Sequence, residues 1–520
     1  MVWRPEDPQG NESGKVRWEI VPFTRGKGLD LGCGPHKAFP HFTGVDSCKD
    51  TELFGIDMKP DVVVDTCEQL PFDDKSQDFV FSSHLLEHIE DYRSALKEWW
   101  RVLKVDGHLV LYLPHKHFYP NVGQPGSNPD HKHDFEPSDI VSAVREFANG
   151  CDILVKEDRK EGMEYSFLLV FKKLEQSVWR ASYIDRATKA SRKSACVVRY
   201  GGYGDMLQAA AILPALKRQG YRVTVMTTPR GQSVIEHDPH VDEFYIQDEN
   251  QVPNHLLTEF WEAQAVKYDR FINLSESIEG TLLALPGRAP HLWPHDVRHK
   301  YMNRNYHEFT AELAGVEFAP EGKFYPTKQE SAKASSLVSA GEFAVVYALS
   351  GSSQHKFYAG MDSVIANLLL NIPNVRIFMT GDEACKLLEQ GWDSEPRITL
   401  LSGKQTIRET LALAQKANVV IGPETGVLNA VAFDSCVAKI CLLSHSSVEN
   451  LTKHWINSYP IEPIDTPCYP CHRMHYGMKY CREHEETGTA MCQMSIDPQR
   501  IVDAVMAVYG KSSNESAKAA

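Results

Sequence analysis

The sequence predicts an α/β protein, with one Rossmann-like unit followed by a two-lobed part made of two further Rossmann-like halves. Short apolar runs alternate with helical stretches over residues 26–115, which is the pattern of βαβ units. The same alternation restarts at Ala195 and again at Phe343. A chain of 520 residues has room for about three folding units, so the length agrees with the number of restarts.

The first unit is predicted from five apolar runs that read as strands. Residues 94–103 read as an amphipathic helix between the last two of them, and a late strand over residues 165–172 ends the unit. The five predicted strands are Gly28–Leu31, Thr43–Val45, Val62–Val64, Phe79–Ser82 and His108–Leu113.

The rest of the chain divides by composition and pattern. A polar, basic stretch is predicted to be a linker, because a basic run of this kind is usually a solvated face. The two lobes are predicted from strands over 196–200, 222–227, 343–349, 375–380 and 418–421, with a helix over 205–219. The predicted units are 1–172, a linker 173–194, lobes 195–335 and 336–510, and a disordered tail 511–520.

Glycine and acidic residues follow the strands of the first unit. The first strand ends in Asp30-Leu-Gly-Cys-Gly34, where Gly32 and Gly34 allow a tight turn and a close approach to a ligand. Asp46 follows the second strand, where a carboxylate can bind both hydroxyls of a ribose. Asp65 follows the third strand and can accept a hydrogen bond from an adenine amino group.

This series, continued by Asp78-Phe-Val-Phe-Ser-Ser-His-Leu-Leu-Glu-His88, resembles the class I methyltransferases that use S-adenosylmethionine. The resemblance covers about residues 26–172 and implies S-adenosylmethionine as the cofactor. Asp57 is a second acidic residue at a strand end and is an alternative ribose ligand, although Asp46 is favoured. The resemblance implies Gly32 and Gly34 at the methionine end of the cofactor, Asp46 at the ribose, and Asp65 with Glu68 at the adenine; Asp30, at the end of the first strand, is a further predicted cofactor-binding residue.

Two histidine-rich segments are candidates for the methyl-transfer chemistry, Pro114-His-Lys-His117 and Asp130-His-Lys-His-Asp134. A histidine titrates near neutral pH, so His117 or His133 could act as a general base on a sugar hydroxyl. Solvated or structural histidines are the competing interpretation, and a metal-dependent variant also stays open.

Asp205 is the candidate base of the second region. It follows a glycine-rich turn, Gly201-Gly-Tyr-Gly204, at the start of a predicted helix. The helix dipole favours an ionised carboxylate there, which could take a proton from an attacking hydroxyl. The competing interpretation is an ordinary helix cap, a position in which aspartate is common.

Three strand ends of the last region carry groups suited to a nucleotide diphosphate. Gly422-Pro-Glu-Thr-Gly426 lies between a strand and a predicted helix over 427–433, where backbone amides can bind a diphosphate. Lys356 follows another strand and could reach the same phosphates. Glu383 follows a third strand and could bind a ribose.

Together these motifs resemble the ADP-heptose heptosyltransferases of glycosyltransferase family 9, which have the GT-B fold. The resemblance covers about residues 195–510 and implies an inverting enzyme without a catalytic metal. The sequence departs from the family at three positions, with Glu424 in place of the usual Asp, Asn429 in place of His and Tyr358 in place of Trp. The identity of the donor sugar therefore stays open. The implied roles are Asp205 as general base, Lys356 as phosphate ligand, Glu383 as ribose ligand, and Glu424, Thr425 and Gly426 in the donor pocket.

Four cysteines near the C-terminus have metal-ligand spacing. Cys468, Cys471, Cys481 and Cys492 form the pattern C-x2-C-x9-C-x10-C, which can complete a tetrahedral thiolate site. Zinc is the default for such a site, and iron fits the same ligands. The cysteines also resemble the four-cysteine iron site of the protein heptosyltransferases that modify bacterial autotransporters.

Charge and hydropathy exclude some classes of protein. The net charge of -14 argues against general binding of nucleic acid. No apolar run approaches the roughly 20 residues that span a bilayer, and the N-terminus has no apolar signal core, so the predicted location is the cytoplasm. Self-association into a homo-oligomer is left open.

The sequence therefore predicts a bifunctional enzyme that glycosylates and methylates, acting with a nucleotide sugar on a glycan or glycosylated acceptor. Modification of a protein or a nucleic acid is the alternative within the same chemistry. A non-catalytic binding scaffold in one half is the alternative outside it, although Gly32, Gly34, Asp65 and Asp205 argue against it.

Overall fold

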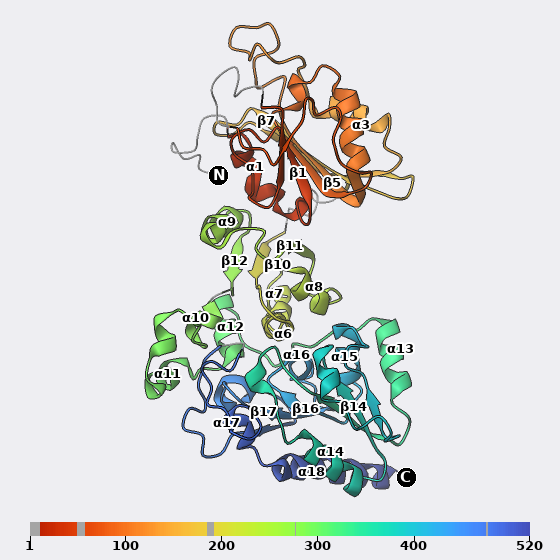
Figure 1. The fold of residues 1–520 in the computed structure, drawn as a ribbon, viewed down its shortest axis with the longest axis vertical. Helices are drawn as coiled ribbons and strands as arrows, with labels where there is room; N and C mark the ends of the chain where they lie inside the picture. The colour runs from red at the N-terminus through yellow and green to blue at the C-terminus, as the bar shows by residue number, and fades with distance from the viewer. Residues whose placement is uncertain (1–10, 49–57, 185–191, 276, 475–476, 520) are drawn as a thin grey trace. The chain divides into compact units, whose positions relative to one another are not determined.

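The computed structural model describes residues 11–48, 58–184, 192–275, 277–474 and 477–519 (Figure 1). The chain forms two compact units, residues 1–193 with 246–269, and residues 194–245 with 270–520. Both units alternate helices with sheets that consist largely of parallel strands, which confirms the predicted fold class.

The first unit is built on one sheet of eight strands in the order β3-β2-β1-β4-β5-β7-β6-β8. The strands from β3 to β5 pair in parallel, and β7 is antiparallel to both β5 and β6. The strands are β1 (Gly28–Leu31), β2 (Thr43–Asp46), β3 (Val62–Val63), β4 (Gln77–Ser83), β5 (Leu103–Pro114), β6 (Cys151–Arg159), β7 (Ser166–Lys173) and β8 (Trp179–Arg180). The short strand β8 lies in the segment predicted to be a linker.

The helices of this unit are amphipathic where they cover the sheet. In α3 (Tyr92–Val102), Asp91 caps the N-terminus by accepting from the Ser94 amide at 3.1 Å. The buried face of α3 includes Trp99, whose indole donates to the Cys67 carbonyl at 2.8 Å. The other helices are α1 (Ser13–Ile20), α4 (Pro137–Arg145) and the short η1 (Val21–Phe23) and η2 (Leu86–His88).

Residues 246–269 belong to the first unit, although the sequence predicted them within a lobe of the second part. They form η3 (Asn254–Leu256) and α9 (Leu257–Ala265). The Phe260 ring packs 5.8 Å from the Trp18 ring, and Gln264 donates to the Trp18 carbonyl at 3.1 Å. The prediction was wrong here because apolar helix positions do not reveal which core receives them.

The first lobe of the second unit is a four-stranded sheet in the order β11-β10-β9-β12. The helix predicted over 205–219 is broken into α6 and α7 around Ala211, because Pro214 has no amide to continue the ladder. The elements are β9 (Ser194–Val198), α6 (Tyr203–Ala210), α7 (Leu213–Arg218), β10 (Arg222–Thr227), α8 (Pro229–Ile235), β11 (Glu243–Ile246), β12 (Arg270–Asn273), α10 (Ser277–Thr281), η4 (Ala289–Leu292), α11 (His295–Met302), α12 (Tyr306–Ala314) and α13 (Lys328–Leu337).

The second lobe is a six-stranded parallel sheet in the order β15-β14-β13-β16-β17-β18. One buried apolar cluster joins this sheet to the first lobe through residues such as Val197, Val346 and Val420. The elements are β13 (Phe343–Ala348), η5 (Gln354–Lys356), α14 (Met361–Asn371), β14 (Val375–Thr380), η6 (Ala384–Leu387), β15 (Ile398–Leu400), α15 (Ile407–Ala414), β16 (Val419–Pro423), α16 (Gly426–Asn429), β17 (Ala438–Leu442), η7 (Val448–Thr452), β18 (Ser458–Ile461), α17 (Met491–Met494) and α18 (Pro498–Ala519).

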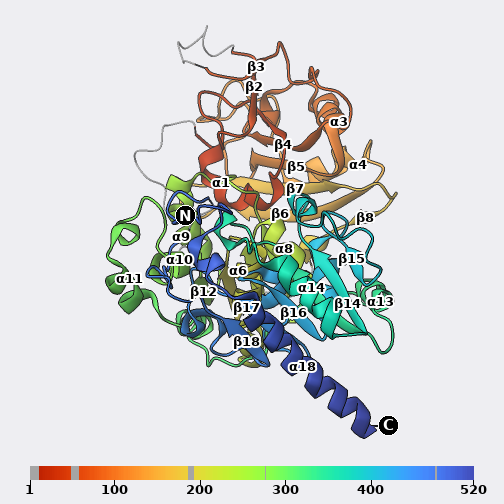
Figure 2. The same cartoon turned by 60° about the horizontal axis from the view of Figure 1, so that its bottom comes forward.

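The last helix corrects the prediction of a disordered tail. Helix α18 continues to Ala519, through a segment in which the good helix formers alanine, lysine and glutamate are interspersed with serine and asparagine. Its N-terminal part lies beside α14 (Figures 1 and 2), and its buried side chains Ile501 and Val505 share a core with Val364 and Leu368. Among the described residues, no helix combines the length and the apolar character needed to cross a bilayer.

Candidate active sites

The turn after β1 is shaped to receive a ligand. Gly32 and Gly34 both adopt left-handed backbone angles, with φ of 66° and 55°. A Cβ on Gly32 would lie 2.9 Å from the Leu85 side chain, whereas a Cβ on Gly34 would meet nothing within 4 Å. Gly32 is therefore required by packing, and Gly34 faces open space in which another molecule could lie.

Two buried carboxylates hold this turn in place. Asp30 accepts from the Ala38 amide at 2.8 Å, and burial raises the pKa of its carboxyl to about 7. Asp46, at the end of β2, accepts from the Gly34 amide at 3.0 Å and from the Cys48 amide at 3.1 Å. Each carboxylate oxygen has a second lone pair, so Asp46 can still accept from a ribose hydroxyl.

The other predicted cofactor residues are less constrained. Asp65 is exposed after β3, and Glu68 is half-buried in the following turn, with its amide bonded to the Thr66 hydroxyl. The alternative ribose ligand Asp57 lies outside the described residues.

The two candidate histidines of the first unit are not brought to one place. His117 is largely exposed and lies 3.6 Å from a carboxylate oxygen of Glu136. The His133 ring contacts the Glu90 carbonyl at 3.0 Å and packs on Tyr92 and Phe135. These contacts hold the His133 ring in place, which favours a structural role for it.

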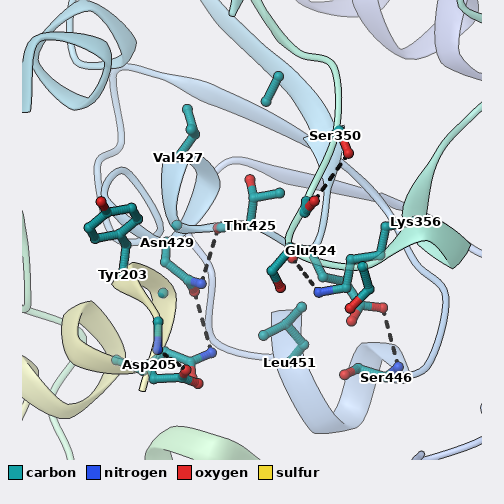
Figure 3. Close-up of a pocket in the computed structure, with 18 of the residues that line it drawn as sticks. Tyr203, Asp205, Ser350, Lys356, Glu424, Thr425, Val427, Asn429, Ser446 and Leu451 are labelled. Atoms are coloured by element: carbon teal, nitrogen blue, oxygen red, sulfur yellow. Dashed lines mark hydrogen bonds between the residues drawn. The ribbon is translucent and has the colours of Figure 1, made fainter. Parts of the chain in front are cut away.

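The second unit contains a cavity of about 600 Å³ whose wall is formed by both lobes. The first lobe contributes the N-terminus of α6, Arg230 of α8 and Glu279 of α10. The second lobe contributes the strand ends that carried the sequence motifs. Of the predicted residues, Asp205, Lys356, Glu424, Thr425 and Gly426 line this cavity, so the fold brings together groups from both lobes (Figure 3).

Asp205 is held by a buried arginine. Its carboxylate accepts from the Gly202 amide at 2.7 Å, which caps α6, and it lies 3.1 Å from Arg199. Arg199 is 1% exposed and also contacts Glu279 at 2.6 Å. Burial alone would lower the pKa of Arg199, but the charges of Asp205 and Glu279 outweigh burial and raise it. The Asp205 side chain is 35% exposed, so it can cap the helix and still face a bound molecule.

Sequence reasoning missed Arg199 and Glu279. The signal for Arg199 was an arginine at the end of the otherwise apolar run Ala195-Cys-Val-Val-Arg199. A charged group there must find carboxylate partners when the strand is buried.

Lys356 and Glu424 form the opposite wall. The Lys356 ammonium, on a side chain that is only 8% exposed, donates to the Glu424 carbonyl at 2.8 Å. The Glu424 carboxylate is bound by the Ser444 and Ser446 amides at 2.7 and 3.2 Å and lies 2.9 Å from His445. Burial alone would raise the pKa of Glu424, but His445, Lys356 and the Ser444 amide hold it well below its usual value. Glu424 thus fixes the loop after β17 and the position of Lys356.

Thr425 and Gly426 lie where the two lobes touch. A Cβ on Gly426 would come within 3.1 Å of Tyr203, and a Cβ on Gly204 within 3.4 Å of the Gly426 amide. Both positions need glycine because two backbones approach each other closely. The helix predicted over 427–433 is only the short α16, and Asn429 bonds back to the Thr425 carbonyl at 3.1 Å.

Glu383 is not in the cavity wall. Its carboxylate is 75% exposed and pairs with Lys386 at 2.6 Å, whereas the neighbouring Asp382 and Cys385 line the cavity. The role of Glu383 as a ribose ligand stays a prediction, and strand pattern alone does not resolve which residue of the turn after β14 faces the cavity.

The cysteine segment lies beside the same cavity, through Arg473 and Met474. It joins the lobes, since the Ala284 amide donates to the His472 carbonyl at 2.7 Å and Arg298 donates to the Cys471 carbonyl at 3.0 Å. Burial, then the other cysteines, raise the pKa of Cys492. Among the described residues, however, no three of the four sulfur atoms lie within 4.8 Å of one another.

The family model described as "Methyltransferase domain" matches residues 29–111. That stretch runs from β1 into β5 and includes Gly32, Gly34, Asp46 and Asp65. The first unit therefore contains a methyltransferase domain, and the chain is a transferase. No curated protein matches the chain.

Three solved structures describe the likeness to known proteins. The glycosyl transferase family 9 protein of Veillonella parvula DSM 2008 is similar at 13% identity and TM-score 0.45, over 61% of this chain and 97% of that one. E. coli ADP-heptose lps heptosyltransferase II is similar at 13% identity and TM-score 0.43, over 62% of this chain and 99% of that one. A SAM-dependent methyltransferase of Thermotoga maritima is similar at 18% identity and TM-score 0.24, over 31% of this chain and 94% of that one.

Proposed function

We propose that this chain is a bifunctional enzyme that transfers a methyl group in its first unit and a sugar in its second. The methyl donor would be S-adenosylmethionine and the sugar donor a nucleotide-diphosphate sugar, with a glycan or glycosylated molecule as acceptor. The observation that carries the second half of the proposal is the cavity of the second unit, with the Asp205 carboxylate on one wall and the Lys356 ammonium on the other.

For sugar transfer, Asp205 would accept the proton of the acceptor hydroxyl while that oxygen bonds to the anomeric carbon of the sugar. The bond from that carbon to the diphosphate breaks, and the nucleoside diphosphate leaves with the electron pair. Arg199 and Glu279 keep Asp205 in place. Lys356 would stabilise the negative charge on the leaving phosphate.

For methyl transfer, the turn from Gly32 to Gly34 would receive the methionine end of the cofactor, and Asp46 the ribose. The open space beside Gly34 and the free lone pairs of Asp46 fit that ligand. When bound, S-adenosylmethionine supplies an electrophilic methyl group on sulfur. The domain binds and orients it next to the acceptor.

The Gly34→Leu variant is expected to weaken binding of S-adenosylhomocysteine at least about tenfold from a Kd of about 1 µM. The new side chain would fill the space in which the ligand lies. Gly162→Leu is the matched control, because Gly162 also has a left-handed φ and a Cβ there also meets nothing within 4 Å. Calorimetry on both variants checks this, and equal binding by the two variants would contradict the assignment.

We also propose that Cys468, Cys471, Cys481 and Cys492 hold one structural zinc or iron ion. The charges of the other three thiolates add to the burial that raises the pKa of Cys492, and binding would need the segment to contract around the ion. The double variant Cys468→Ser/Cys471→Ser is expected to lose about one metal ion per chain by elemental analysis. Cys436→Ser, at an exposed cysteine outside the cluster, is the control. Unchanged metal content in the double variant would end the proposal.

A further inference from the structure

Glu87 is a buried carboxylate without a hydrogen bond. It lies in η2, directly after β4, and its side chain is 0% exposed. Within the described part of the chain, neither of its carboxylate oxygens has a hydrogen-bond partner. Burying a polar group in this way is costly unless a donor or a cation compensates.

Histidine nitrogens surround this carboxylate at slightly more than hydrogen-bond distance. His131 and His88 each place Nε2 near Oε1 of Glu87, at 3.9 and 4.0 Å. The ligand atoms of Glu87, His88 and His131 all lie within 4.8 Å of one another, and among the described residues they are the one group of three or more that does. The rings of His88 and His131 meet edge to face with centroids 4.7 Å apart.

The backbone holds the two halves of this cluster together. The Glu87 carbonyl accepts from the Lys132 amide at 2.8 Å and from the His133 amide at 3.2 Å. These bonds fix the segment that carries His131 against η2. His84 adds a third imidazole, with Nδ1 3.7 Å from the Glu87 carboxylate and Nε2 bonded to the Ser166 hydroxyl at 2.9 Å. Such an outer partner would orient the carboxylate.

The cluster is adjacent to the methyl-donor turn. His84 has a left-handed backbone with φ of 52°, which is costly for a residue with a side chain. The next residue, Leu85, packs against Gly32 of the turn. The segment from the strained His84 to Glu87 therefore connects the turn that would hold the methyl donor, which Leu85 contacts, to the cluster that begins three residues after His84.

The spacing fits a small divalent ion. Two ligands about 2.1 Å from one zinc ion at a tetrahedral angle lie about 3.4 Å apart. The distances of 3.9 and 4.0 Å would need to shorten by only about half an ångström. Two imidazoles and one carboxylate leave the fourth position of the ion open, as in catalytic rather than structural zinc sites.

We propose that Glu87, His88 and His131 bind one divalent transition-metal ion of the zinc type, with an open position beside the methyl-donor turn. That position is suited to an oxygen ligand, such as water or the hydroxyl of a methyl acceptor. The existence of the site does not depend on the proposed methyl transfer, since metal binding is measured without methyl donor or acceptor.

The test is titration of metal-free, full-length chain with zinc, and with cobalt as a spectroscopic probe. Cobalt bound to nitrogen and oxygen gives weak visible bands without the strong near-ultraviolet thiolate bands of a cysteine site. The proposal expects the weak nitrogen–oxygen cobalt bands in addition to any thiolate bands that the cysteines contribute, and one zinc ion in excess of those held by the cysteines. Glu87→Gln and His131→Ala are each expected to lower the affinity for that ion by about 100-fold or more. Even the loss of a residue that only hydrogen-bonds to a metal ligand typically lowers metal affinity by roughly 10–100-fold.

His133→Ala is the matched control, since His133 lies on the same segment but contacts Glu90. It is expected to leave zinc affinity unchanged, and thermal melting of each variant separates metal loss from unfolding. Should Glu87→Gln prove insoluble, His131→Ala decides alone. Equal zinc binding by wild type and His131→Ala would overturn the proposal. The proposal would also be overturned if Glu87→Gln were more stable than wild type and bound as much zinc, because Glu87 would then be a protonated acid buried in the core.

Discussion

Replacing Asp205 by asparagine is expected to slow sugar transfer by about 10²–10⁴-fold, the usual cost of losing a general base. The acceptor hydroxyl has a high pKa and must lose its proton as the bond to the sugar forms. Asparagine keeps the acceptor oxygen that caps α6 through the Gly202 amide, but it cannot take a proton. Binding of the nucleotide sugar is expected to stay almost unchanged, so the loss should appear in kcat.

The structure offers a matched control for the cap. Asp139 occupies the same third position of α4 and bonds back to the Glu136 amide at 2.9 Å, in the other unit. Asp139→Asn changes the cap in the same way and is expected to leave sugar transfer intact. An Asp205→Asn enzyme with near-normal turnover on its acceptor would show that Asp205 is a cap and not a base.

The second large effect is expected at Lys356. Lys356→Ala should weaken binding of a nucleoside diphosphate by about 10–100-fold, because a hydrogen bond to a charged group contributes roughly 1.5–3 kcal/mol. The ammonium lies in the cavity wall and already donates to the Glu424 carbonyl. A phosphate oxygen would be its second acceptor. Calorimetry with ADP, GDP and UDP in turn measures the change.

Loss of a buried lysine also lowers stability, so the control must share that cost. Lys439 in β17 of the same lobe is fully buried and donates to the Asp434 and Val437 carbonyls at 2.5 and 2.7 Å. It does not line the cavity. Lys439→Ala should destabilise the lobe without a selective loss of nucleotide affinity. Equal losses of nucleotide affinity in Lys356→Ala and Lys439→Ala would show that Lys356 does not bind the diphosphate.

Strand ends were the part of the site that the sequence could predict. Parallel strands place their carboxyl ends along one edge of a sheet, so Gly34, Asp46, Lys356 and Glu424 could each be located from the apolar run before it. The direction of a side chain within a turn has no such signal. Glu383 therefore points to Lys386 and solvent while Asp382 faces the cavity.

Long-range packing was the part that could not be predicted. The close contact of Gly204 with Gly426 joins two turns that lie more than 200 positions apart in the sequence. The attachment of Phe260 to Trp18 is of the same kind. A local pattern reveals that a residue is apolar or small but not which partner it meets. The Glu87 cluster was missed for the same reason, since His131 approaches it from a distant loop.

The central claim is that one chain carries two separate transferase sites, and crossed titrations test it most directly. Wild type, Gly34→Leu and Lys356→Ala would each be titrated by calorimetry with S-adenosylhomocysteine and with ADP, GDP and UDP. The account predicts that wild type binds S-adenosylhomocysteine and at least one nucleoside diphosphate, each at about one per chain. Gly34→Leu should weaken binding of S-adenosylhomocysteine only, and Lys356→Ala should weaken binding of the nucleoside diphosphate only. A folded wild type that binds neither, or a single variant that loses both, would contradict it.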